Sequence, residues 1–188
     1  MTQTKAIKLP RTYKLLLALA VVIGPFSWLM FTQDGQRRSD LFVLTLLGRP
    51  SFDVAYQRLN PAVSATQLRD QFPKVDFDCQ DHPPRQVCRA TIGSFNGFPA
   101  YAAQLEWQGQ RLQLVQLIYR QRYRDAIEVQ LRQDLGPADE YSTASNPVLL
   151  WVLDHGLLLL PAEKVSQRHD AALIWRAPPL PNAQSTDD

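Results

Sequence analysis

The sequence is poor in the side chains that carry most catalytic and metal chemistry. Only three histidines and two cysteines occur among its 188 residues. His82, His155 and His169 each stand beside Asp, Gly or Pro in an expected turn or loop, where a solvated histidine is the ordinary outcome. A structural zinc needs four ligands at recognisable spacing, and the sequence offers no such set. We therefore expect no metal and no cofactor.

Common catalytic motifs are also missing. No G-x-S-x-G sequence of a serine hydrolase is present. The glycine-containing stretch at 93–97 (GSFNG) lacks the lysine and the hydroxyl residue of a phosphate-binding loop. We therefore expect a protein that is not an enzyme.

A clustered positive field is lacking in most of the chain. The net charge of +2 depends on four basic residues that precede Phe31, and 16 basic and 18 acidic residues follow it. Nucleic-acid binding requires a concentrated positive surface. A nearly neutral domain therefore predicts no nucleic-acid partner.

Charged residues are absent from residues 15–31 (LLLALAVVIGPFSWLMF). A helix of this length spans about 26 Å, close to the lower limit for a hydrocarbon core of about 30 Å. No small-x-small cleavage site follows the run, and the first cysteine is Cys79, so neither a cleaved signal peptide nor a lipoprotein signal is indicated. We expect an uncleaved, single-pass transmembrane anchor.

The flanking charges predict the orientation of this anchor. Basic residues at positions 5, 8, 11 and 14 precede it without any acidic residue, whereas Arg37 and Arg38 after it are mixed with Asp34 and Asp40. Positive charge favours the cytoplasmic side of a membrane. We expect residues 1–14 to be a cytoplasmic tail. The rest of the chain would then lie in the periplasm, anchored to the inner membrane of a Gram-negative-like cell.

The two cysteines, Cys79 and Cys88, flank a proline turn at 83–84. Two strands joined by this turn would bring the cysteines opposite each other, and a disulfide there would stabilise the fold by roughly 2–3 kcal/mol. The alternatives are two free thiols or half of a metal site. We favour the disulfide, which agrees with an oxidising compartment.

The remaining chain divides into three parts. We expect a linker and juxtamembrane segment at 32–48, an α+β domain at 49–177 and a disordered tail at 178–188. Within the first part, residues 32–40 are a polar linker, and Ser39 and Asp40 are expected to cap the apolar segment 41–47. This segment either packs on the domain as a helix or strand, or forms a surface for a membrane partner, with Leu41 and Phe42 as candidate contacts.

The α+β domain is expected to combine an antiparallel sheet of about five to seven strands with one main helix. Ser64 and Gln67 have the spacing of a capping box that opens a short helix ending before Pro73. The main helix is predicted at 123–135, with Gly136 as its cap. The expected strands are 75–79, 87–92, 101–107, 111–119, 148–153, 157–160 and 173–176, and residues 139–147 are expected to form a loop.

Two groups of residues are candidates for binding. Arg120, Arg122 and Arg124 could bind an anionic group, although a solvated helix start is the simpler explanation. The strands 148–153 and 157–160, with Trp151, are apolar at nearly every position, which fits either a hairpin buried on both faces or a surface for another protein.

These observations favour a membrane-anchored periplasmic domain that acts as a non-enzymatic accessory, assembly or interaction module of an envelope protein complex. Its partners would be the inner membrane, through residues 15–31, and another envelope protein. The alternative is an envelope sensor or ligand-binding module for an anionic ligand.

The predicted topology has a direct test. Alkaline phosphatase fused after residue 188 should be active in cells, because the enzyme matures only on the exported side of the membrane. An inactive phosphatase fusion, together with an active cytoplasmic reporter fused at the same site, would contradict the predicted orientation.

Overall fold

The computed structural model describes residues 10–142, 147–163 and 171–179. The chain divides into two compact units, residues 1–40 and 41–188, each described here by itself. His169, residues 1–9 of the expected cytoplasmic tail and residues 180–188 of the expected disordered tail lie outside the described residues.

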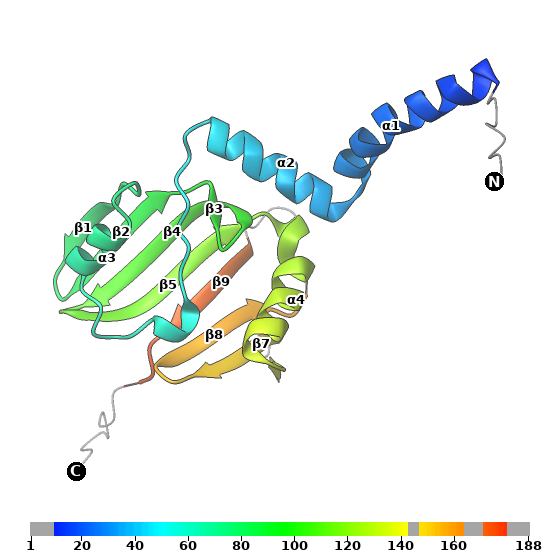
Figure 1. Ribbon diagram of the computed structural model, residues 1–188. Coiled ribbons are helices and arrows are strands. Elements are labelled where there is room, and N and C mark those ends of the chain that lie inside the picture. Colours follow the sequence, from blue (N-terminus) through cyan, green and yellow to red (C-terminus); the bar gives the residue numbers. More distant parts are fainter. Residues whose placement is uncertain (1–9, 143–146, 164–170, 180–188) are drawn as a thin grey trace, which may run out of the picture. The chain divides into compact units, whose positions relative to one another are not determined.

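The described part of the chain is an α+β protein with a large antiparallel sheet (Figure 1). Its helices are α1 (Arg11–Phe31), α2 (Gln33–Leu46), α3 (Ala65–Gln71) and α4 (Arg124–Leu135), with 3₁₀ turns η1 (Tyr56–Arg58) and η2 (Gln121–Tyr123). Its strands are β1 (Asp78–His82), β2 (Arg85–Thr91), β3 (Ser94–Phe95), β4 (Phe98–Gln108), β5 (Arg111–Tyr119), β6 (Asp139–Ser142), β7 (Pro147–Leu153), β8 (Gly156–Pro161) and β9 (Ala171–Arg176).

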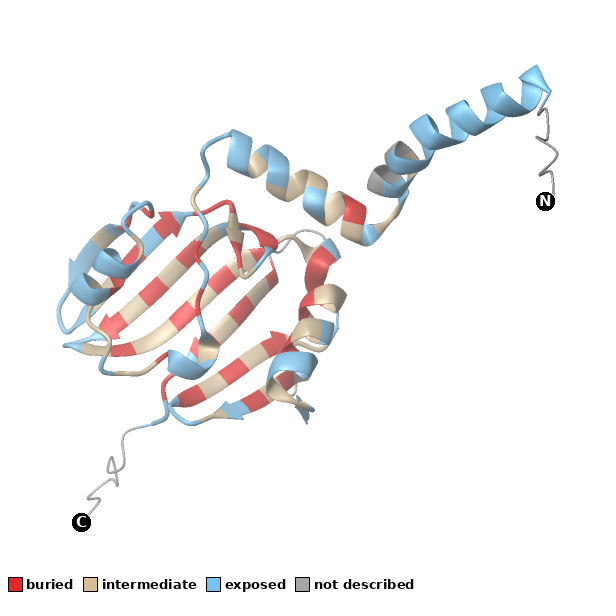
Figure 2. Ribbon diagram, viewed as in Figure 1, coloured by how far each residue is buried: buried red, intermediate tan, exposed pale blue. Residues whose placement is uncertain are grey.

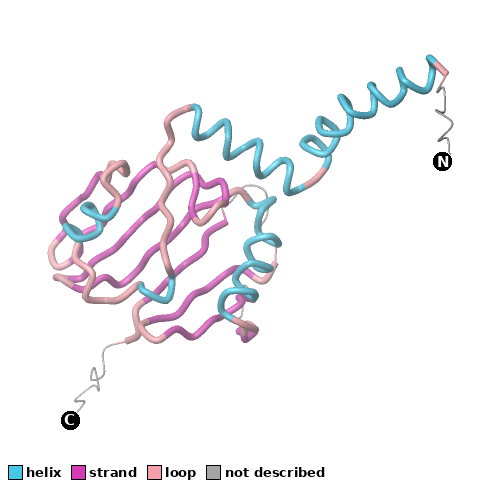
Figure 3. Tube along the Cα trace, in the orientation of Figure 1, coloured by secondary structure: helices cyan, strands magenta, loops and turns pink. Residues whose placement is uncertain are grey.

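The strand order across the sheet is β1-β2-β4-β5-β9-β8-β7-β6, and β3 pairs with β4 beside this path. Figure 3 shows the strands and the helices along the trace of the chain. Strand β5, whose sequence is apolar on both faces, lies inside the sheet between β4 and β9. The last strand of the chain, β9, is inserted between β5 and β8 and joins the two hairpins into one sheet.

The sheet has nine strands, more than the five to seven expected. One additional strand is β3, which is joined to β4 by Asn96 and Gly97. Both residues have positive φ, as a type I′ hairpin turn requires, and the Asn-Gly pair is a sequence signal for this turn. The other additional strand is β6, so the expected loop at 139–147 is wrong for residues 139–142, which pair with β7 at the edge of the sheet.

The hairpin of β4 and β5 is confirmed, with one correction at Tyr101. The alternation of residues in the sequence puts this side chain on one face with Ala103, Leu105 and Trp107, but it is exposed whereas the other three are buried. A β-bulge between Ala100 and Ala102 shifts the register and reverses the alternation at this point. The sequence pattern of alternating residues does not reveal such an insertion.

The hairpin of β1 and β2 brings the two cysteines together. Cys79 and Cys88 are direct partners in the strand register, with Cα atoms 4.0 Å apart, and they form the expected disulfide. The first strand begins at Asp78 rather than at residue 75, because a turn closed by a hydrogen bond from Val75 N to Phe72 O precedes it.

One row of paired side chains crosses the buried face of the sheet from β1 to β7. Each pair in this row is set by the strand register, from the disulfide at one side to β7 at the other. We call it the core row, and its members are Cys79, Cys88, Leu105, Val115, Trp175, Leu158 and Trp151. Figure 2 shows the resulting alternation of buried and half-buried positions along the inner strands, such as β5, β8 and β9.

Helices α3 and α4 lie on the face that carries the core row (Figure 1). The capping box between Ser64 and Gln67 is confirmed and starts α3, whose buried residue is Leu68. The predicted ridge of α4 is confirmed as well, because Tyr123, Ile127 and Leu131 are buried in the core. The segment before α3 crosses the same face and buries Phe52.

The N-terminal helices differ from expectation at residues 32–40. These residues do not form a linker, because α2 runs from Gln33 to Leu46. Thr32, rather than Ser39 or Asp40, caps it by accepting a hydrogen bond from Gly35 N at 3.0 Å. Asp34 pairs with Arg37 and Arg38 at 2.8 Å and 3.0 Å, which supports a helix in a polar sequence.

The expected membrane anchor falls within α1. Among the helices of the described residues, none combines the length and the apolar character that a membrane span requires. The anchor at 15–31 therefore stays a prediction from the sequence.

Two tyrosines, the buried Tyr119 and the half-buried Tyr56, allow a matched test of the core. The Tyr119 hydroxyl is buried, and no described residue hydrogen-bonds to it, whereas the Tyr56 hydroxyl has a hydrogen bond with Asn96. Tyr119→Phe should raise the free energy of unfolding by about 1 kcal/mol, because it removes an unsatisfied polar group. Tyr56→Phe should lower it by about 1 kcal/mol. Urea denaturation of both variants measures this, and a Tyr119→Phe protein less stable than wild type would contradict the expectation.

Candidate functional site

The face of the sheet opposite the core row is the candidate site, and we call it the open face. Its side chains belong to the alternate positions of each strand, so the register places them in rows of their own. One such row runs from Arg89 through Gln104 and Gln116 to Ile174, Leu159 and Leu150. The row is polar on β2, β4 and β5 and apolar on β9, β8 and β7.

The other rows show the same division. On β6 to β9 the open face carries only two charged side chains, among apolar or small ones otherwise. We call this region the apolar half, and its uncharged members are Tyr141, Val148, Leu150, Val152, Leu157, Leu159, Pro161, Ala172 and Ile174. On β5, Leu114 and Ile118 continue it toward the polar strands.

Within the unit of residues 41–188, no described element packs on the apolar half. Its residues are outside the buried core cluster and are not among the partly buried hydrophobic residues that pack against that cluster. Leu150, Leu157 and Leu159 are half-buried by their strand neighbours, while Val152 is 71% exposed and Tyr141 is 59% exposed. Helices α3 and α4 lie on the other face (Figure 1). The apolar half is therefore a contiguous hydrophobic surface.

Two opposite charges stand on this surface. Arg176 on β9 pairs in register with Leu157 and Leu114, and Asp139 on β6 pairs with Leu150. Both side chains are exposed, and neither forms an ion pair with another described residue. We call the open face of β1, β2 and β4 the polar half. Some of its charged side chains have partners on the same face: Glu106 contacts Arg85 at 3.6 Å, and Arg89 donates to Gln104 at 3.2 Å.

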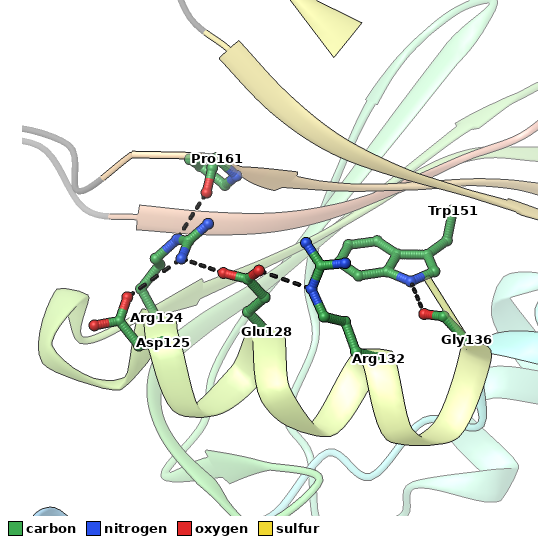
Figure 4. Close-up of polar contacts among 7 residues, drawn as sticks. All are labelled: Arg124, Asp125, Glu128, Arg132, Gly136, Trp151 and Pro161. Carbon is green, nitrogen blue, oxygen red and sulfur yellow. Dashed lines mark hydrogen bonds and ion pairs between the residues drawn. The ribbon is translucent and has the colours of Figure 1, made fainter. Parts of the chain in front are cut away.

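The candidate contact Trp151 belongs to this hairpin but is buried in the core. Trp151 lies on the buried face, where its indole N–H donates to the carbonyl oxygen of Gly136 at 3.0 Å (Figure 4). Its neighbour Val152 lies on the open face. Because both parities of β7 and β8 are apolar, the sequence does not distinguish the covered face from the open one. A signal was available in the charged residues Asp139 and Arg176, which share the parity of the open face.

The other expected contact segment is the end of α2. Phe42 is 70% exposed, and Leu46 and Leu47 are exposed as well, whereas Leu41 is half-buried. Phe42 thus lies on an exposed apolar stretch of the helix. Its part in a contact stays a prediction.

The three arginines at the start of α4 do not share one role. Arg124 is buried, its side chain only 8% exposed, and it donates to the carbonyl oxygen of Pro161 at 2.9 Å. It also forms ion pairs with Asp125 and Glu128 (Figure 4). The guanidinium of Arg124 therefore joins α4 to the end of β8.

Arg120 and Arg122 lie against aromatic rings instead. The guanidinium of Arg120 is 5.6 Å from the ring centre of Tyr101, and that of Arg122 is 5.0 Å from the ring centre of Tyr123. Arginine binds aromatic faces in this way at many protein surfaces. A shared anion site of all three arginines would require Arg124 to give up its internal partners.

The pKa of Glu128 reflects this network. Partial burial raises the pKa, but the hydrogen bond from Arg132 and the charge and hydrogen bond of Arg124 outweigh it, so the pKa lies below its ordinary value. Glu128 therefore stays ionised between the two arginines, with Arg132 Nε at 2.8 Å.

A polar cleft lies on the other face, between the segment before α3 and the end of α4. Its volume is about 460 Å³, and Asp53, Tyr56, Asn96 and Asp134 are among the lining residues. Asn96 holds both backbone groups of Val54, at 2.8 Å and 2.9 Å. Burial raises the pKa of Tyr56, so its phenol is protonated at neutral pH. The contacts of this cleft are satisfied within the chain, and we assign it no ligand.

Comparison of the chain with protein-family models, with curated proteins and with solved structures finds no match. The described residues form an α+β protein with a large antiparallel sheet, and α3 and α4 lie on one face of that sheet.

The Arg124 network predicts a change in stability. Removing one partner of a buried ion pair costs about 3 kcal/mol or more, and the partial exposure of Glu128 reduces this cost. Arg124→Met should therefore lower the free energy of unfolding by about 2 kcal/mol at neutral pH. Arg132→Met is the matched control, because this arginine also pairs with Glu128 but is 39% exposed, and its loss should stay below about 1 kcal/mol.

The deficit of Arg124→Met should also depend on pH. A carboxylate whose folded pKa is depressed stabilises the fold above its unfolded pKa, and this stabilisation is lost as the pH falls through the folded pKa. The difference between wild type and Arg124→Met, measured by denaturant titration, should thus shrink in acid. Equal effects of the two arginine variants at all pH values would contradict the network described here.

Proposed function

We propose that the protein is a membrane-anchored, non-enzymatic interaction module that holds together subunits of an envelope protein complex. The soluble domain would supply the binding surface, and the anchor would keep that surface near the inner membrane. The binding surface is the apolar half of the open face.

The observation that carries the proposal is the contiguous apolar surface across β6 to β9. Monomeric soluble proteins rarely expose a large connected hydrophobic patch, and such patches mark sites of association. On this face Val152 and Tyr141 are more than half exposed, and no described element of the same unit packs on the leucines between them. A protein partner would remove this area from water, at roughly 25 cal/mol per Å² of apolar surface.

The placement at the envelope is supported by two other features. The sequence of residues 15–31 is free of charge and preceded by basic residues only. The disulfide between Cys79 and Cys88 is of a kind that persists in oxidising compartments. Together they favour a domain on the periplasmic side of the inner membrane.

The alternative function, an anion sensor built on Arg120, Arg122 and Arg124, receives less support. Arg124 is occupied by Glu128, Asp125 and Pro161 within the chain. The remaining two arginines stack on tyrosines and define no enclosed site.

Photo-crosslinking in cells tests the proposal. The residue p-benzoylphenylalanine would replace Val152 in the full-length chain, with a second variant carrying it at Val129 as a control. Both valines are exposed, at 71% and 56%, but Val129 lies on α4 and Val152 on the open face. We expect a discrete protein adduct from position 152 only.

Two outcomes would contradict this function. One is the absence of a protein adduct from position 152 across growth conditions. The other is the same set of adducts from positions 152 and 129, which would indicate nonspecific collision.

A further inference from the structure

We propose that the subunit covering the apolar half is a second copy of this chain, packed sheet against sheet. This inference rests on the proposed function, because it uses the same surface. The observation behind it is self-complementarity, in which the charges and the apolar residues of this surface match those of a copy of itself.

The two charges are placed as a twofold axis requires. In strand order the apolar half is β9-β8-β7-β6, with Arg176 on the first strand and Asp139 on the last. A twofold axis parallel to the strands, midway between β8 and β7, places β9 of one copy opposite β6 of the other. Arg176 of each copy then faces Asp139 of its partner, and the contact is isologous.

The offset between these charges is small enough to bridge. Arg176 shares a row with Leu157 and Val152, and Asp139 belongs to the next row, with Leu150 and Leu159. Adjacent rows on one face are about 7 Å apart, and packed sheets are separated by about 10 Å. A long arginine side chain reaching toward a short carboxylate spans such a gap between aligned sheets.

In this arrangement the apolar residues of one copy also pack against apolar residues of the other. The axis passes between Leu159 and Leu150 and between Leu157 and Val152, which are register partners on β8 and β7. In the dimer the β8 residues of one copy face the β7 residues of the other, so leucine and valine side chains interdigitate. The polar strands β1, β2 and β4 lie outside the contact.

The apolar half is small for an interface between free molecules, so the proposed dimer depends on the membrane anchor that holds two copies together. Four strands about 4.8 Å apart and five residues at about 3.4 Å give a footprint on the order of 300 Å², below the roughly 800 Å² per partner of a standard interface. Such a contact is weak between free molecules. Two domains anchored in one bilayer meet at a high effective concentration, which compensates for a small interface.

A lipid surface explains the same face less well. Electrostatic attachment to anionic membranes typically uses four to eight clustered basic residues, at about 1 kcal/mol each. The apolar half carries Arg176 alone, and Asp139 on the same face would be repelled.

Charge exchange tests the inference in the full-length chain in its membrane, with the crosslinker at Val152. Wild type should give an adduct of twice the chain mass. Arg176→Glu places two acidic residues opposite each other, and Asp139→Arg places two arginines there, so each variant alone should reduce the adduct about ten-fold. Co-expression of the two variants, distinguished by tags, should restore a mixed adduct, because each charge then meets its opposite.

The design separates folding from binding. A misfolded variant is not rescued by mixing, and Arg89→Glu, on the polar half, should leave the dimer adduct unchanged. Failure of the mixed pair to restore the adduct, or insensitivity to both single changes, would overturn the dimer. An adduct with a different protein would overturn the dimer but support the proposed function, whereas no protein adduct, or an adduct with lipid alone, would refute both.

Discussion

The register of the antiparallel sheet is the constraint on which the rest of the structure depends. Paired residues share a face, so one set of pairings fixes the core row from the disulfide of Cys79 and Cys88 to Trp151. Helix α4 packs on this row through Ile127 and Leu131, and Arg124 ties the start of the helix to β8. A slip of one residue in any pair would exchange the two faces of a strand.

The same constraint creates the open face. Once Leu158 and Leu160 are committed to the core, Leu157 and Leu159 must point the other way. In β1, β2 and β4 the alternate positions are largely polar, as for a sheet with one solvated face. In β7, β8 and β9 they are apolar, so the chain carries hydrophobic surface beyond the needs of its own core. The proposed interaction module and the proposed dimer both rest on this surplus.

Local signals predicted much of the fold correctly. The capping box of Ser64, the i, i+4 ridge of α4, the glycine after α4 and the proline turn between the cysteines all act within a few residues of the chain, and all are present. The misses have local causes too. Thr32, rather than Ser39, caps α2. A β-bulge at Ala100 places Tyr101 on the exposed side of β4. The short strands β3 and β6 depend on pairing with β4 and β7, a longer-range condition that a window of sequence contains only weakly.

The sequence by itself determined the elements with strong local periodicity, the disulfide pairing and the absence of any recognisable catalytic motif. Only the tertiary structure decided which parity of β7 and β8 is covered, and hence that Trp151 is core and Val152 is surface. It also decided that Arg124 serves the fold and that Asp139 and Arg176 share one face. The physical reason is that burial and charge pairing depend on strands and helices far apart in the chain, whereas caps, turns and periodicity depend on neighbours.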